Sequence, residues 1–105
     1  MARSNAERRL AELNAVLTAL GHPARRQILM TIHFRGGEMS AGEIAARFRH
    51  SWPTTTRHLR VLEQAGLVMA TQHGRVRFYQ ANHEPLQLVE QWLKWFDKKQ
   101  HRDHD

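Results

Sequence analysis

The chain has no cysteine among its 105 residues and no apolar run long enough to cross a membrane. Without cysteine it can form neither a disulfide bond nor a thiolate site for a metal or for redox chemistry. No secretory signal peptide is apparent in the sequence either. Together these absences predict a cytoplasmic protein with no membrane partner.

Acidic side chains are scarce relative to basic ones. Ten Asp and Glu residues stand against sixteen Lys and Arg residues, which gives a formal net charge of +6 and a sequence pI near 11.1. This surplus favours a polyanion as partner, although the same charge can simply keep a protein soluble. The length fits a single domain over residues 1–105. Its hydrophobic core is small, so association with a second subunit would add to the apolar surface that it buries.

Catalytic patterns are missing as well. The sequence shows no Ser/His/Asp or Cys/His grouping with a plausible scaffold and no phosphate-cradling glycine loop. It also has no carboxylate pair that the expected fold would place in a cleft. We therefore expect a binding protein rather than an enzyme.

The most informative segment is residues 51–68, whose pattern is typical of a DNA-recognition helix running into a β-strand. In a helix, Thr55, Leu59 and Leu62 share one buried face. Ser51 is suited to cap this helix at its start, and Gly66 is suited to end it. The outward face is cationic and hydroxylated, and it carries Pro53, Thr54, Thr56, Arg57, Arg60 and Gln64.

Apolar periodicity predicts further helices over residues 5–20, 23–34, 41–49 and about 84–99. Ser40 and Glu43 have the spacing of a capping box, which marks the start of the third of these helices. This short helix and the helix from Trp52 form a helix-turn-helix, which presents its second helix to the major groove of DNA.

Two β-prone runs, residues 67–72 and 75–81, follow the recognition helix. His73 and Gly74 join them as a tight turn, with Arg75 at the tip. The cross-strand pairs expected from this turn are Met69 with Phe78 and Ala70 with Arg77. The hairpin is a wing, so the predicted fold class is mainly α with a β-hairpin wing, a winged helix-turn-helix.

The last predicted helix carries two adjacent apolar rows. One row is Leu86, Val89, Leu93 and Phe96, and the other is Leu88, Trp92 and Trp95. Two such rows are more than one small domain needs to bury, so we expect them to form a subunit interface. Residues 100–105 are polar and are expected to fray.

The order of these elements resembles the ArsR/SmtB family of winged-helix transcriptional repressors over about residues 15–99. The motifs that carry the resemblance are LGHPARRQIL at residues 20–29, AGEIA at 41–45, PTTTRHLRVL at 53–62, AGLV at 65–68 and GR at 74–75. The resemblance implies a homodimer built on the first and last helices and a palindromic operator in double-stranded DNA, near the protein's own promoter. It also implies repression until an unidentified small-molecule inducer releases the DNA. The expected interface residues are Leu10, Leu13, Leu17, Leu88, Trp92, Trp95 and Phe96.

The candidate DNA contacts are Trp52, Thr54, Thr56, Arg57, Arg60, Arg75 and Arg77. Arginine offers a bidentate donor to guanine and a persistent charge to phosphate, so base and phosphate roles both stay open for Arg57 and Arg60. The alternatives are a solvated helix face and a charged hairpin that resists edge-to-edge aggregation. Family members often carry glutamine where this chain has Trp52, whose indole cannot copy the contact of an amide with adenine.

Metal sensing is common in the family that this sequence resembles. The arsenic and cadmium sensors would need cysteines where this chain has Ser40 and Gly42. The zinc and cobalt sensors carry ligands at both ends of the last helix; this chain retains Glu90 at one end and His101 and His104 at the other. We predict no metal and no other cofactor. The alternatives are a zinc-responsive repressor that uses the C-terminal histidines and a winged-helix protein-interaction module.

Overall fold

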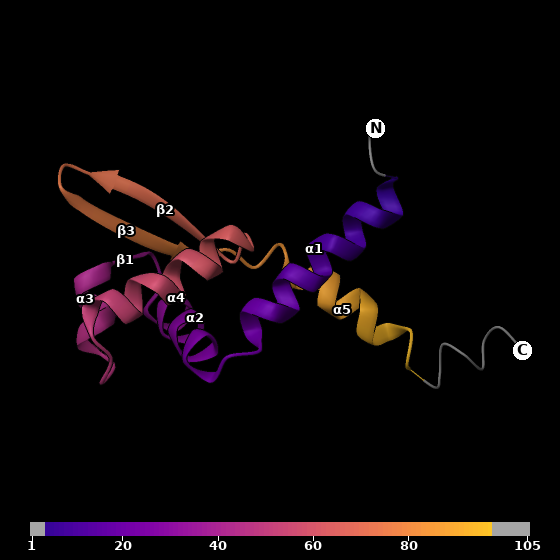
Figure 1. Cartoon of the computed structure of the whole chain (residues 1–105), viewed down its shortest axis with the longest axis horizontal. Coiled ribbons are helices and arrows are strands. Elements are labelled where there is room, and N and C mark those ends of the chain that lie inside the picture. The colour runs from indigo at the N-terminus through magenta and orange to yellow at the C-terminus, as the bar shows by residue number, and fades with distance from the viewer. Residues whose placement is uncertain (1–3, 98–105) are drawn as a thin grey trace, which may run out of the picture.

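The computed structural model describes residues 4–97 of the chain. Its elements are, in order, α1 (Asn5–Leu20), α2 (Pro23–Arg35), β1 (Glu38–Ser40), α3 (Ala41–Ala46), α4 (Trp52–Gln64), β2 (Val68–His73), β3 (Val76–Ala81) and α5 (Leu86–Lys94). Helices α1 and α5 pack together at one end of the molecule, and the hairpin β2–β3 extends at the other (Figure 1). The mainly helical fold with a hairpin wing confirms the predicted fold class.

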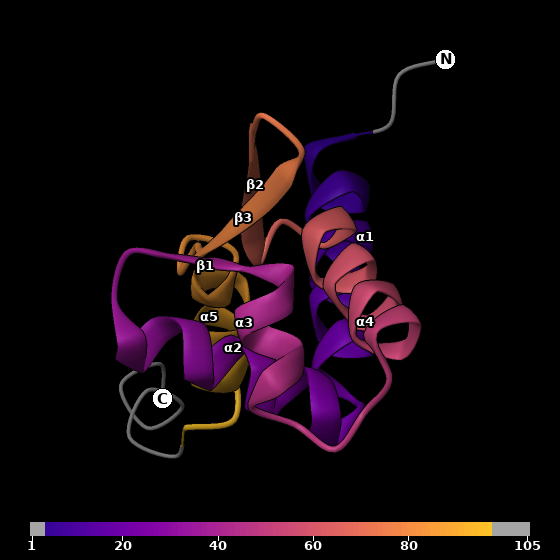
Figure 2. The same ribbon diagram turned by 90° about the vertical axis from the view of Figure 1, so that its left-hand side faces the viewer.

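The core lies where α2, α3 and α4 meet the inner side of the sheet (Figure 2). Its fully buried side chains include Val16, Ile28, Ile32, Met39, Ile44, Leu59, Leu62 and Leu67. These residues come from α1, α2, β1, α3, α4 itself and the segment before β2, so α4 is held from several directions. In residues 4–97, no helix combines the length and the apolar character needed to cross a membrane.

The first two helices match the sequence prediction closely. Helix α1 has the predicted bounds, and α2 extends one residue beyond the predicted end, to Arg35. Gly36 and Gly37 follow with φ of 75° and 71°, in the left-handed region that favours glycine. This pair of conformations ends α2 and turns the chain into β1.

Strand β1 joins the hairpin, so that the sheet has the order β1-β3-β2. No strand was predicted for these residues. Met39 of β1 pairs with Tyr79 of β3, and both side chains are buried. The third strand therefore fastens the base of the wing to the core.

The turn of the wing is Gly74-Arg75, and the prediction of His73-Gly74 was wrong. Gly74 has φ of 61° and stands at the first central position of a two-residue turn, where a type II′ hairpin needs glycine. The observed pairs are Met69 with Gln80 and Ala70 with Tyr79, in place of the predicted Met69 with Phe78 and Ala70 with Arg77. Arg75 still lies at the tip, as predicted.

Two helices are shorter than predicted. Helix α3 ends at Ala46 rather than Arg49, and α5 runs over Leu86–Lys94 rather than about 84–99. After each helix, backbone N–H groups bond to the carbonyl three residues back, which tightens the last turn into 3₁₀ geometry. The periodicity of the side chains continues through such turns, so the sequence pattern overestimates the α-helix.

Candidate nucleic-acid interface

Helix α4 begins with the predicted cap. The Ser51 hydroxyl accepts a hydrogen bond from the backbone N–H of Thr54 at 3.3 Å and donates one to the Thr54 hydroxyl at 2.9 Å. Pro53 lies in the first turn, where its missing N–H is not needed. Gly66, with φ of 78°, follows the helix end. The hydroxyl of Thr54 therefore already serves the helix start.

The two faces of α4 are divided as predicted. Thr55, Leu59 and Leu62 are buried against the core. The outward positions are exposed at Pro53, Arg57, Arg60 and Gln64, and half-buried at Thr54 and Thr56. A helix fixed by one buried face thus presents two arginines to the outside.

Trp52 is 60% exposed, yet its ring lies against the first turn of α3. A Cβ atom added to Gly42 would stand 2.8 Å from Cη2 of the indole, closer than such atoms approach each other. Gly42 thereby allows Trp52 to pack beside the start of α3. Sequence reasoning missed this role, because the two residues belong to different helices and only the pairing of α3 with α4 brings them together.

A groove of about 490 Å³ runs between the start of α4 and the wing. Five of the residues that line it are Trp52 and Thr56 of α4, Arg75 of the turn, and Arg77 and Tyr79 of β3. Four of these are predicted DNA contacts, so the fold brings the recognition helix and the wing to one surface.

The two wing arginines differ in their surroundings. Arg75, in the turn, makes no hydrogen bond or ion pair with residues 4–97. Arg77 donates from Nη2 to Oε2 of Glu63 on α4 at 2.8 Å, and this carboxylate raises the pKa of the guanidinium. Its guanidinium also lies 5.8 Å from the centre of the Tyr79 ring. Glu63 is a second residue that sequence reasoning missed.

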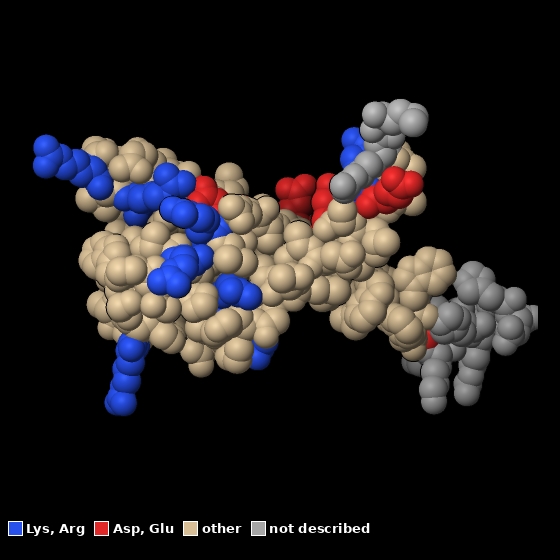
Figure 3. Space-filling view, in the orientation of Figure 1, with Lys and Arg blue, Asp and Glu red and all other residues tan. Residues whose placement is uncertain are grey.

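Charge is unevenly distributed over the surface seen in Figure 3. Basic side chains gather over the wing and α4, whereas most of the acidic side chains in this view lie over α1. In this view the basic side chains thus lie over the two elements that border the groove. A polyanion is attracted to such a surface.

His58 lies on α4 between the recognition helix and the rest of the fold. Its ring centroid is 4.6 Å from that of His22 and 6.1 Å from that of His50. Burial lowers the pKa of His58, and the neighbouring His22, Arg25, His50 and Arg57 lower it further. With the pKa below its ordinary value, His58 is neutral near pH 7.

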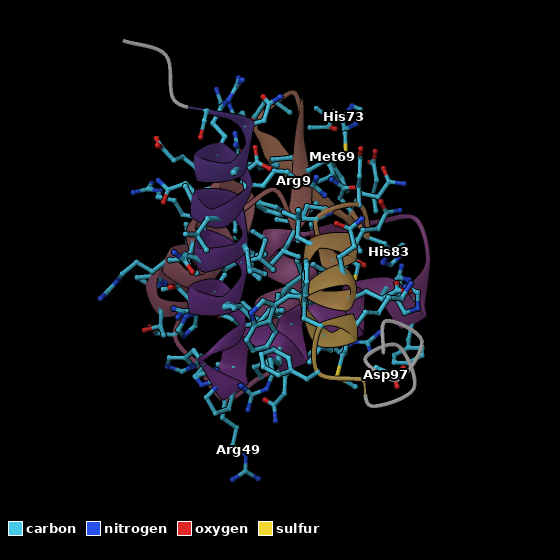
Figure 4. All side chains as sticks on the ribbon, turned by 90° about the vertical axis from the view of Figure 1, so that its right-hand side faces the viewer. Arg9, Arg49, Met69, His73, His83 and Asp97 are labelled. Carbon is cyan, nitrogen blue, oxygen red and sulfur yellow. The ribbon has the colours of Figure 1, made fainter. Side chains whose placement is uncertain are left out.

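The predicted dimer residues lie on or beside the α1–α5 end, which Figure 4 faces. There Arg9 of α1 donates to Oε1 of Gln91 on α5 at 2.7 Å. The exposed fraction is 57% for Leu10, 72% for Trp95 and 67% for Phe96. Leu13 is only 8% exposed and packs within its own chain, whereas Leu17 and Leu88 are half-buried and Trp92 is exposed. Among the predicted interface residues, the exposed apolar side chains therefore gather mainly at the C-terminal end of α5 and directly after it.

Potential metal ligands do not cluster in residues 4–97. In that part of the chain no three His, Asp or Glu side chains gather as a metal site would need. Nδ1 of His33 and Nε2 of His83 lie 3.1 Å apart, a pair that joins α2 to the segment before α5. His101 and His104, on which the zinc alternative depends, lie outside the described residues.

The helix pair, the exposed basic face and the wing define a winged helix-turn-helix DNA-binding protein. A family described as "Helix-turn-helix domain" matches residues 20–70. The transcriptional repressor SdpR of Bacillus subtilis is 35% identical over 91 residues, which cover 87% of this chain and 99% of that protein. A crystal structure of an ArsR family transcriptional regulator, 30% identical, superimposes with a TM-score of 0.77 over 100% of this chain and 98% of that one. The chain belongs to the ArsR family of DNA-binding transcriptional regulators.

Another similar protein is a repressor of an arsenical resistance operon. The arsenical resistance operon repressor of Staphylococcus xylosus is 34% identical over 82 residues, which cover 78% of this chain and 77% of that protein. This chain has no cysteine with which to bind arsenic as a thiolate complex. The likeness to this repressor therefore does not assign a thiolate site to this chain.

Proposed function

We propose that the protein is a homodimeric repressor that binds an inverted-repeat operator in double-stranded DNA. Helix α4 enters the major groove, and the wing tip lies along phosphates or in the adjacent minor groove. The observation that carries this proposal is the groove shared by Trp52 and Thr56 of α4 and Arg75 of the wing. Helix α4 and the wing, which can each contact DNA, thus border the same groove.

Each side chain of α4 has a role that fits its position. Arg57 and Arg60 are exposed on the outward face, so they can reach guanine edges or phosphates. Thr56 can offer a hydroxyl to a phosphate, and so can Thr54, whose oxygen accepts from Ser51 and which keeps its own proton to donate. Trp52 packs its exposed indole on a sugar or a thymine methyl group.

Dimer formation accounts for the apolar end of α5. Trp92 and Phe96 contact each other edge to face, with ring centroids 5.1 Å apart, and both are exposed in a single chain. So large an apolar surface on a small domain is normally covered by a partner. A second copy that packs α1 and α5 against their counterparts would present two α4 helices about 34 Å apart, one turn of DNA.

We expect the operator to lie near the protein's own promoter. We assign the release of the DNA to a small-molecule inducer and not to a metal. The alternative of a zinc-responsive repressor requires His101 and His104, which the described residues do not include. The alternative of a protein-interaction module requires that the basic face of α4 be dispensable. DNA selection with wild type and with Arg57→Ala separates that module from a DNA-binding repressor.

The decisive experiment selects fragments of the source genome that bind the purified protein. A dimer with two-fold symmetry requires that the enriched fragments share an inverted repeat whose half-sites are about one helical turn apart. Enriched fragments without any dyad would contradict the dimeric mode. No enrichment over random DNA would contradict sequence-specific binding altogether.

A further inference from the structure

The wing carries two arginines that differ in availability to a phosphate. Arg75 sits in the turn and makes no hydrogen bond or ion pair with residues 4–97. Arg77 is two residues further along and is held by Glu63, whose carboxylate oxygen lies 2.8 Å from its Nη2. A charged hydrogen bond of this length is among the stronger kinds that side chains form.

The carboxylate that holds Arg77 comes from the recognition helix itself. Glu63 is the penultimate residue of α4, and its half-exposed side chain faces the flank of β3. The buried Tyr79 ring gives the guanidinium a second support at 5.8 Å. A phosphate that contacts the Arg77 guanidinium must either displace the Glu63 carboxylate or lie beside it, where the two anions repel each other. Arg75 has no such partner to give up.

We propose that Glu63 is a specificity-determining residue that holds Arg77 off the phosphate backbone. The wing then supplies one phosphate contact per subunit, through Arg75, and not two. This inference rests on the proposed function, because it concerns how the same surface meets DNA. Phosphate contacts carry no sequence information, and they supply nearly all of the binding to DNA that lacks an operator. By withholding one of them, Glu63 limits the affinity of the protein for non-operator DNA.

Salt dependence counts phosphate contacts and thus tests the inference directly. Log affinity falls with log salt by about 0.9 per neutralised phosphate, which is about 1.8 for one contact in each of two subunits. Glu63→Gln keeps the shape of the side chain but removes its charge. We expect this variant to bind non-operator DNA more tightly, with a slope steeper by up to about 1.8. A merely structural defect would weaken binding and would not steepen the slope.

The two arginines of the wing provide matched controls. Arg75→Gln is expected to make the slope shallower by about 1.8, whereas replacing the Glu63–Arg77 pair as a whole, which leaves the net charge unchanged, should not alter it. The double variant Glu63→Gln with Arg77→Gln is expected to return to the wild-type slope. The Arg77 guanidinium, which Glu63→Gln alone would release towards the DNA, is absent from this variant. Thermal unfolding of each variant verifies that the fold is intact.

Three results would overturn the inference while leaving the proposed function standing. The first is a slope that Glu63→Gln with Arg77→Gln makes as shallow as Arg75→Gln does, since Arg77 would then contact phosphate in the wild type. The second is a steeper slope in Glu63→Gln that remains in the double variant Glu63→Gln with Arg77→Gln. The effect would then come from the net charge of the protein and not from the release of Arg77. The third is no effect of Glu63→Gln. If wild type selects no operator, the proposed function itself fails.

Discussion

The indole of Trp52 occupies the space into which a methyl group on Gly42 would project. Cη2 and Cζ3 of the ring would stand 2.8 Å and 3.1 Å from such a methyl carbon. The close approach joins the first turn of α3 to the first turn of α4, and so involves both helices of the helix-turn-helix. Glycine at this point leaves room for the ring, and its backbone conformation does not require glycine.

Gly42→Ala should displace the indole at a cost below the about 1–3 kcal/mol of a methyl group added to a well-packed core, because the ring is exposed and can move and because alanine favours the helix over glycine by about 0.5–1 kcal/mol. Chemical denaturation measures the change in the free energy of unfolding. The matched control is Gly42→Ala combined with Trp52→Gln, in which the methyl group meets no ring and should cost much less. An equal cost in both backgrounds would place the effect elsewhere.

Arg57→Ala should weaken operator binding by about 1–3 kcal/mol and relax the preference at one base position in each half-site, if the side chain reads a base. Binding-site selection with the variant measures this preference. Uniformly weaker binding with an unchanged selected sequence would reassign Arg57 to phosphate. Arg60→Ala, on the same exposed face, is the comparison variant.

Trp92→Asp together with Phe96→Asp should yield a monomer or an unfolded chain, because charges would enter the apolar surface that a second copy covers. Sedimentation measures the mass, and circular dichroism measures the helix content. A wild-type protein that sediments as a folded monomer at micromolar concentration would refute the dimer. Glu90→Ala, at an exposed position of the same helix, should leave the mass unchanged.

Acid should destabilise the fold through His58. Burial and its cationic neighbours lower the pKa of His58 in the folded protein below the ordinary 6.5, so the unfolded chain takes up this proton at a higher pH. Stability is therefore retained above the ordinary value and lost as the pH falls from there towards the lowered value. Urea unfolding over this range measures the loss, which His58→Gln should reduce. An identical pH dependence in this variant would exclude His58 as the cause.

Zinc should not release the operator. Any site that uses His101 and His104 has only Glu90 left from the ligands that the zinc and cobalt sensors carry at the other end of the last helix, so it falls short of the four donors that zinc normally takes. Operator affinity is measured with chelator and with zinc modestly above any measured dissociation constant. A tenfold loss with zinc, about 1.4 kcal/mol of coupling, that disappears in His101→Ala with His104→Ala would instead identify a metal sensor.

The recognition helix was predictable because its signals are local. The Ser51 cap, the spacing of Thr55, Leu59 and Leu62, and the stop at Gly66 all act within one helix, and each is found as expected. The wing was less predictable, since His73-Gly74 and Gly74-Arg75 are both plausible two-residue turns. In the structure, the turn at Gly74-Arg75 occurs together with pairing of Tyr79 on β3 with Met39 on β1. These two residues are forty positions apart, so no local pattern indicates their pairing.

The sequence by itself determined the presence and order of the helices, the outward arginines of α4 and the family, because each depends on residue types at fixed short spacings. The tertiary structure alone decided which of the candidate contacts remain free. Only the folded chain brings Glu63 to Arg77 and Gly42 to Trp52, and it buries Leu13 while leaving Phe96 exposed. These relationships join separate elements, and no local pattern records how elements pack, because packing depends on the shapes of all the side chains between them.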